Sequence, residues 1–160
     1  MFPLAEANMR VYTRFMTLTE CLCARLRLAA SATTDFYDRA LAPTGLTLTT
    51  YRLLRHLDRL DRASITRLAH SMELDRSTLG RNVKLVEKRG LVKTVPATVL
   101  KDKRQTAYQL TADGAAVLAR AVPLWEQAQN DIAKMSEGEA PALLAALDRL
   151  TQRLENKTHE

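Results

Sequence analysis

The chain has 160 residues, of which 46% are hydrophobic and 5% aromatic, so it can form one compact domain with a mainly aliphatic core. Five Gly and five Pro are few for this length, which favours a helical fold. The sequence contains no run of about 18 apolar residues and no signal-peptide pattern, so we expect a cytoplasmic protein without a membrane span. The net charge of +6 points to an anionic partner.

A long amphipathic helix is predicted near the N-terminus. Apolar and small side chains recur there at intervals of four and three residues, the spacing of one helix face: Leu22, Leu26, Ala29, Thr33, Phe36 and Ala40. Residues 17–20 fit a capping box at the start of this helix, and Pro43 and Gly45 are expected to end it. Cys21 and Cys23 point to different faces of such a helix, which argues against a disulfide between them.

Three shorter helices are predicted next, with a polar break after the first and a tight turn before the third: residues 47–60, 65–72 and 76–89. Thr47 and Asp75 are the expected N-caps of the first and third helices, and Gly90 is the expected end of the third. Two helices joined by a tight turn form a helix-turn-helix, an arrangement typical of DNA-binding domains.

The pattern then changes from helical to β. Residues 91–95 and 106–111 are rich in residues with high β propensity and predict two strands. The intervening residues 96–105 form a polar, basic loop, so the segment predicts a β-hairpin, or wing, beside the helix-turn-helix.

Helical spacing returns in the C-terminal part of the chain. One predicted helix carries a stripe at intervals of three and four residues: Leu118, Ala121, Trp125, Ala128, Ile132 and Met135. Residues 136–139 form a break that fits a second capping box. The last helix carries four leucines on one stripe: Leu143, Leu147, Leu150 and Leu154. The predicted fold is therefore mainly α with a small β-hairpin wing.

The excess positive charge is concentrated in one fifth of the sequence. Residues 76–106 contain nine Lys or Arg and two acids, a net charge of +7 against +6 for the whole chain. In the helix 76–89, polar side chains recur on the face opposite the apolar one: Ser77, Arg81, Lys84 and Lys88. Arg76 and Thr78 lie at the N-terminal end of this helix. A helix that binds in the major groove needs small hydroxyls for close approach, an arginine that can form a bidentate contact, and lysines that bind phosphates. Lys88 taken alone is more simply a solvated surface residue.

The loop of the wing holds a second group of candidate DNA contacts, Lys101, Lys103 and Arg104. An arginine two residues after an aspartate, here Asp102, suits insertion into the minor groove, where the negative potential of A·T-rich DNA is strongest. The alternative is an exposed, charged loop tip without a partner.

These motifs resemble those of the MarR family of transcriptional regulators. Residues 64–92 resemble the family's helix-turn-helix, residues 102–104 its wing motif, and residues 108–114 the entry into its next helix. Residues 41–47 are similar to the family's first inter-helix corner, so the resemblance covers about residues 18–155.

The resemblance implies a homodimer that binds double-stranded DNA at a pseudo-palindromic operator, usually as a repressor. The predicted division is an N-terminal dimerisation region (1–46), a winged helix-turn-helix (47–111) and C-terminal dimerisation helices (112–160), intertwined as one domain. The family's base-contacting positions match Ser77, Thr78 and Arg81, and its wing arginine matches Arg104. We expect Trp125 to lie in the dimer core rather than against a ligand.

Two signals for release from DNA stay open. One is a small aromatic or anionic effector bound where the dimerisation helices meet the DNA-binding lobe, with four candidate residues: Arg25, Tyr51, Arg55 and His56. Arg55 and His56 are equally compatible with a plain surface position. The other signal is oxidation, because Cys23 matches the reactive cysteine of the family's hydroperoxide-sensing branch and Tyr37 one of its supporting tyrosines. Arg27 replaces another of those tyrosines, and both cysteines are also compatible with plain buried positions.

An enzyme and a helical adaptor are the rival classes. The three histidines are scattered and no catalytic motif or metal-ligand spacing is present, so we expect no enzymatic activity, cofactor or metal site. An adaptor would explain the long helices but not the basic segment 76–106.

Overall fold

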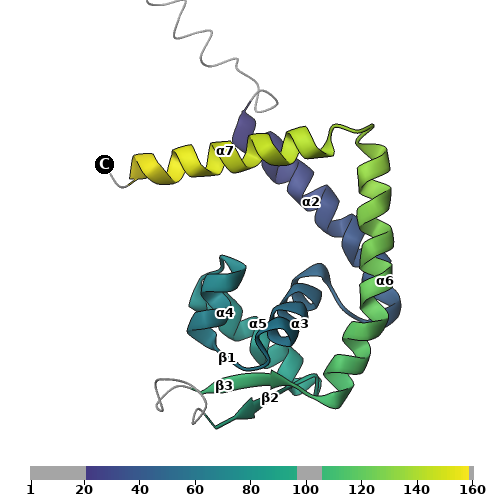
Figure 1. Cartoon of the computed structure of the whole chain (residues 1–160), viewed down its shortest axis with the longest axis vertical. Helices are drawn as coiled ribbons and strands as arrows, with labels where there is room; N and C mark the ends of the chain where they lie inside the picture. Colours follow the sequence, from purple (N-terminus) through teal and green to yellow (C-terminus); the bar gives the residue numbers. More distant parts are fainter. Residues whose placement is uncertain (1–20, 97–105, 159–160) are drawn as a thin grey trace, which may run out of the picture.

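The computed structural model describes residues 21–96 and 106–158, and it shows a small lobe held beneath an arch of three long helices (Figure 1). The arch consists of α2 (Leu22–Leu41), α6 (Ala112–Met135) and α7 (Ala140–Thr158). A short 3-10 turn, η1 (Ala42–Thr44), leads from α2 into the lobe. The lobe contains α3 (Leu48–Leu60), β1 (Ala63–Ser64), α4 (Ile65–Met72), α5 (Arg76–Lys88), β2 (Val92–Val95) and β3 (Ala107–Leu110). The predicted winged helix-turn-helix is confirmed.

Local signals explain where these helices begin and end. Thr47 and Thr50 form a capping box at α3, in which each hydroxyl accepts a hydrogen bond from the other residue's backbone N–H. Gly45 and Gly90 adopt φ values of 68° and 72°, which suit the ends of the preceding helices. Ser64 caps α4 by accepting a hydrogen bond from the backbone N–H of Arg67, a cap that was not predicted from the sequence. The capping box predicted at residues 17–20 lies outside the described residues.

The sheet differs from the predicted two-stranded hairpin because it has a third strand. The strand order is β1-β3-β2 and both pairings are antiparallel, with Ala63 opposite Tyr108 and Val92 opposite Leu110. Strand β1 is two residues long and lies within the predicted polar break, so it has no β pattern of its own. It exists because β3 supplies the hydrogen-bonding partner.

The second predicted capping box, at residues 136–139, was wrong. The hydroxyl of Ser136 donates to the carbonyl of Ala133 in the preceding helix, so it does not cap α7. Helix α7 begins at Ala140, and the backbone carbonyl of Glu139 accepts the hydrogen bond from the N–H of Leu143.

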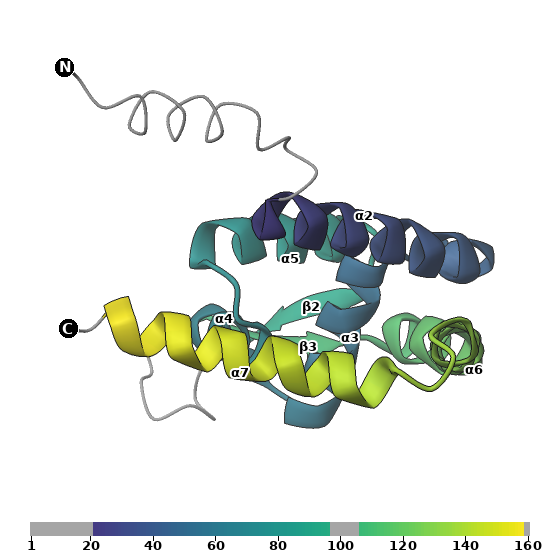
Figure 2. The same cartoon turned by 90° about the horizontal axis from the view of Figure 1, so that it is seen from above.

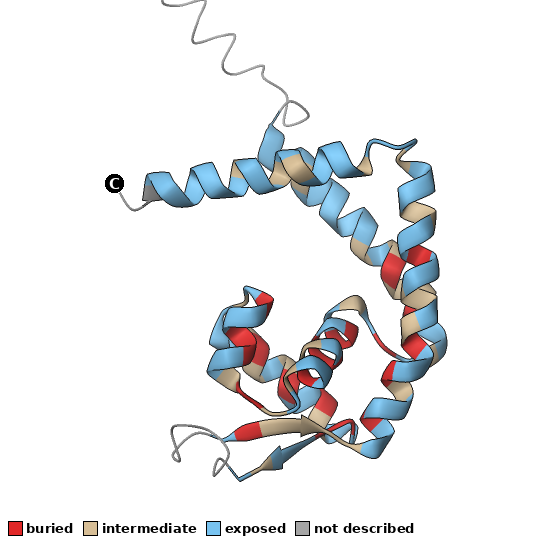
Figure 3. Ribbon diagram, viewed as in Figure 1, coloured by how far each residue is buried: buried red, intermediate tan, exposed pale blue. Residues whose placement is uncertain are grey.

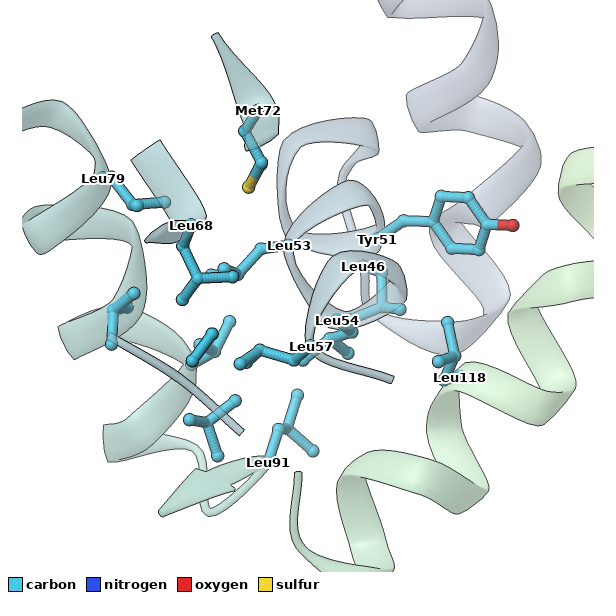
Figure 4. Close-up of a cluster of buried hydrophobic side chains, with 14 of the residues drawn as sticks. Leu46, Tyr51, Leu53, Leu54, Leu57, Leu68, Met72, Leu79, Leu91 and Leu118 are labelled. Carbon is cyan, nitrogen blue, oxygen red and sulfur yellow. The ribbon is translucent and has the colours of Figure 1, made fainter. Parts of the chain in front are cut away.

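One hydrophobic core joins the lobe to the first half of α6 (Figure 4). Helix α3 lies at its centre with three fully buried leucines, Leu53, Leu54 and Leu57. Side chains from α4, α5, the residue before β2 and α6 surround them: Leu68, Met72, Leu79, Val83, Val86, Leu91 and Leu118. Residues 126–135 of α6 and all of α7 lie outside this core, and they are mostly exposed in the single chain (Figure 3). In the described part of the chain, no helix is long and apolar enough to cross a membrane.

Candidate nucleic-acid interface

The turn between α4 and α5 sets the direction of the candidate DNA-contacting helix. Glu73 adopts a left-handed conformation with φ 54°, and the N–H of Leu74 reaches back to the carbonyl of Ala69 at 3.0 Å. Asp75 then begins α5 as its N-cap. Because Leu68, Met72 and Leu79 are buried on the two sides of this turn, the angle between the helices is held by the core.

Helix α5 has one buried face and one basic face. Leu79, Val83 and Val86 are at most 1% exposed, and the opposite side presents to solvent the four predicted polar residues: Ser77, Arg81, Lys84 and Lys88. Arg76 is also exposed, and Thr78 is half-buried. Among the described residues, no acidic side chain pairs with Arg76, Arg81, Lys84 or Lys88, although Arg81 Nε lies 3.5 Å from the carbonyl oxygen of Ser77. This basic face is therefore free to bind an anionic surface.

Asp75 organises the N-terminal end of the basic face. Its Oδ1 accepts hydrogen bonds from the Ser77 hydroxyl at 2.6 Å and from the Thr78 N–H at 2.8 Å. These bonds, the one from the Ser77 side chain first, hold the pKa of Asp75 well below its usual range. The Ser77 proton is engaged by the carboxylate, so the hydroxyl oxygen is left as an acceptor. The sequence did not indicate this pairing.

We expect the Asp75 cap to make stability depend on pH. A carboxyl group whose pKa is lower in the folded than in the unfolded chain stabilises the fold. This contribution is complete at pH values above the pKa in the unfolded chain, about 3.9, and it is lost as the pH falls through the pKa in the folded chain. Asp75→Ala should therefore lower the Tm at pH 7, and the difference from the wild type should narrow progressively below about pH 4. Asp75→Asn is the control, because asparagine caps equally well without titrating. A difference that stays constant from pH 7 to pH 3 would contradict a charged cap.

The tip of the wing is not part of the described structure. The predicted contacts Lys101, Lys103 and Arg104, with Asp102, lie outside the described residues. The base of the wing is formed by β2 and β3, and the Thr94 hydroxyl on β2 donates to Glu87 Oε1 of α5 at 2.6 Å. This bond, which the sequence did not predict, ties the wing to the helix with the basic face.

A pocket of about 290 Å³ lies where the arch meets the lobe. Its lining comes from α2, α3 and α6: Tyr37, Leu48, Tyr51, Arg52, Arg55, His56 and Trp125. Three of the four predicted effector residues, Tyr51, Arg55 and His56, are thus brought together. Arg25 does not line this pocket, because it lies in the first turn of α2 and Tyr37 near the end of the same helix.

Aromatic side chains form one wall of this pocket. The Trp125 ring stacks on Tyr51 with 5.7 Å between ring centroids, and on Tyr37 with 6.4 Å. The Tyr37 hydroxyl donates to Gln129 Oε1, which joins α2 to α6. The Trp125 ring thus packs within one chain and lines this pocket, while its place in a dimer core stays a prediction.

Cationic side chains of α3 also line this pocket. Arg52, which was not among the predicted effector residues, lies one helical turn from Arg55 and His56. Arg55 is 3.9 Å from Asp58 in an exposed ion pair, which contributes little attraction. Burial, followed by the charges of Arg52 and Arg59, lowers the pKa of His56. His56 is therefore neutral at pH 7, and the positive charge of the pocket comes from the arginines.

The redox candidate Cys23 lies in a different place. Both cysteines are free and exposed in the single chain, so a buried position within the chain was wrong. Cys23 and Tyr37 are fourteen residues apart on α2, about 21 Å along the helix axis, so they are not in contact within one chain. Cys23 and Arg27 instead line a groove between α2 and α7 with the apolar residues Leu22, Leu26, Ala30, Leu150 and Leu154.

Comparisons with known proteins agree with this arrangement. A family model described as the MarR family matches residues 44–105. The Mycobacterium tuberculosis transcriptional regulator MosR, solved in complex with DNA, is 34% identical over 86% of this chain and 98% of its own, with a TM-score of 0.75. A search among curated proteins gave no match.

Two further structures share the fold at lower identity. Bordetella bronchiseptica BpsR is 21% identical with a TM-score of 0.70, over 86% of this chain and 94% of its own. A cysteine-to-serine mutant of E. coli MarR, complexed with operator DNA, is 17% identical with a TM-score of 0.69, over 89% of this chain and 96% of its own. With the family model, the MosR similarity and the winged helix-turn-helix all in agreement, the chain belongs to the MarR family of DNA-binding transcriptional regulators.

Proposed function

We propose that this protein is a homodimeric repressor that binds a pseudo-palindromic operator through α5 and the wing, and that a small aromatic acid releases it. The observation that carries the DNA-binding part is the solvent-exposed basic face of α5, on which Arg81, Lys84 and Lys88 have no acidic partner among the described residues. The proposed contacts on this face are Arg76, Ser77, Thr78, Arg81 and Lys84, and those on the wing are Lys101, Lys103 and Arg104.

The exposed apolar side chains of the arch support a dimer. Six large hydrophobic residues of α2, α6 and α7 are more than half exposed: Leu22, Leu28, Met135, Leu143, Leu144 and Leu154. Helix α7 extends away from the core (Figures 1 and 2). The groove between α2 and α7 has a volume of about 570 Å³ and a mostly apolar lining. A soluble monomer rarely exposes such a surface, so we infer that a second copy covers it.

The pocket between α2, α3 and α6 supports an aromatic acid as the effector. In BpsR, DNA binding is regulated by 6-hydroxynicotinic acid. In this chain, stacked rings at Trp125 suit a planar ligand, and Arg52 and Arg55 suit its carboxylate. The pocket volume of about 290 Å³ suits a ligand with a single ring.

The test of DNA binding is selection of duplexes from a random-sequence library by the purified full-length chain. We expect an enriched pseudo-palindrome, an affinity that falls steeply with salt, and a mass of two chains by sedimentation. Lys84→Ala should reduce the salt slope by about one per half-site, or about two for the dimer, whereas Arg149→Ala on the exposed surface of α7 should leave it unchanged. Failure to enrich any duplex would favour the helical adaptor and overturn the proposal.

Trp125 gives a direct readout of effector binding, because it is the only tryptophan and its ring lines the pocket. Titration with 6-hydroxynicotinate and benzoate should change its fluorescence in a saturable way and release the selected duplex. Arg55→Ala should weaken both effects, whereas Arg59→Ala, an exposed residue of the same helix outside the pocket lining, should not. Release by peroxide that Cys23→Ser abolishes, with no response to acids, would instead establish the redox alternative.

A further inference from the structure

Leu85 is a large hydrophobic residue that the described part of the lobe leaves more than half exposed to solvent. Of the large hydrophobic side chains that are more than half exposed in the described part of the chain, all but Leu85 lie on the helices of the arch, where a second copy would cover them. Leu85 lies on α5 and is 52% exposed. It contributes nothing to the buried face of α5, so neither the core nor the dimer accounts for a leucine at this position.

The position of Leu85 relative to the basic face follows from helix geometry. Leu85 is four residues after Arg81, which places it about 40° around the helix and about 6 Å further along the axis. It is adjacent to Lys84 and three residues before Lys88, so cations surround it on the exposed side of α5. From Ser77 to Leu85 the helix rises about 12 Å, which equals the approximate width of the major groove. When Arg81 contacts a base edge, Leu85 lies next to the same groove.

The chemistry of the groove restricts what Leu85 can contact. A leucine side chain forms no hydrogen bonds, and every base edge in the major groove presents donors or acceptors. Thymine alone among the four bases adds an apolar group, the C5 methyl. We propose that Leu85 packs against a thymine methyl one helical turn beyond the Arg81 contact and so determines which base is accepted there. This inference rests on the proposed DNA-binding function.

The test compares two forms of the duplex that the chain selects: one with thymine, and one with deoxyuridine, which lacks only the methyl group. Burial of one methyl group is worth about 0.8 kcal/mol, which corresponds to about fourfold per half-site and about fifteenfold for a symmetric dimer. The wild type should bind the deoxyuridine duplex more weakly by about that factor. Leu85→Ala should bind the thymine duplex more weakly by a similar factor and lose the sensitivity to the methyl group.

Two control variants separate this contact from other effects. Lys84→Ala should weaken both duplexes equally, because a phosphate contact does not sense the methyl group. Leu85→Met should retain the preference for thymine, because methionine keeps an apolar side chain of similar size. The Tm of Leu85→Ala should equal that of the wild type, since the side chain is exposed.

The possible outcomes distinguish the two proposals. If the wild type and Leu85→Ala lose affinity by the same factor on deoxyuridine, or if Leu85→Ala binds the thymine duplex like the wild type, the methyl contact is wrong while DNA binding stands. If the wild type selects no duplex at all, the proposed function and this inference are both wrong. Single thymine-to-deoxyuridine changes should locate the effect at one position in each half-site.

Discussion

Gly114→Ala is expected to destabilise the fold by roughly 3 kcal/mol, because the added methyl group meets backbone rather than a movable side chain. A Cβ at Gly114 would lie 2.0 Å from the carbonyl oxygen of Leu91 and 2.9 Å from its carbonyl carbon. That carbonyl also accepts a hydrogen bond from the N–H of Thr111, the N-cap of α6. Relief of the clash therefore requires the start of α6 to move away from the core residue Leu91.

Chemical denaturation of the full chain measures this effect, and Gly80→Ala is its matched control. Gly80 is also helical, but a Cβ there meets nothing within 4 Å. The same substitution at Gly80 should stabilise α5 by about 0.5–1 kcal/mol, because alanine has the higher helix propensity. If Gly114→Ala shifted the free energy of unfolding in the same direction as Gly80→Ala, the close approach of α6 to Leu91 would be wrong.

Arg81→Ala is expected to weaken binding to the selected operator by about 1–3 kcal/mol, because a bidentate contact from arginine to guanine is lost. The Arg81 side chain is exposed on the basic face of α5, so its removal should leave the free energy of unfolding nearly unchanged. Fluorescence anisotropy with a labelled duplex measures the affinity, and repeating the selection with the variant shows whether one position has lost its base preference.

Two comparisons sharpen the interpretation of this variant. Arg81→Lys should not restore the base preference, because lysine keeps the charge but lacks the planar pair of donors. Arg104→Ala in the wing should cost a similar 1–3 kcal/mol. Operator affinity that is unchanged in both alanine variants would overturn the assignment of α5 and the wing as the contact surfaces.

Helices and turns could be predicted from the sequence where nearby residues mark their ends and their apolar face. The helix-turn-helix was predicted from an N-cap at Asp75, a terminating Gly90 and a 3.6-residue apolar period, and the observed α4 and α5 match the predicted helices to within one residue. The basic face was equally predictable, because residues four and three apart on a helix share a face wherever the helix packs. The resemblance to the MarR family rested on the helix-turn-helix together with residues 41–47, 102–104 and 108–114.

Features that depend on residues far apart in the chain arise only from tertiary packing. Strand β1 forms only because Ala63 meets Tyr108, and Gly114 is required only because α6 approaches Leu91. The proposed effector pocket includes Arg52 and Trp125 but not Arg25, because the packing of α2, α3 and α6 determines which side chains converge. Sequence periodicity assigns a residue to a face of its own helix, but it does not indicate which other element that face will meet.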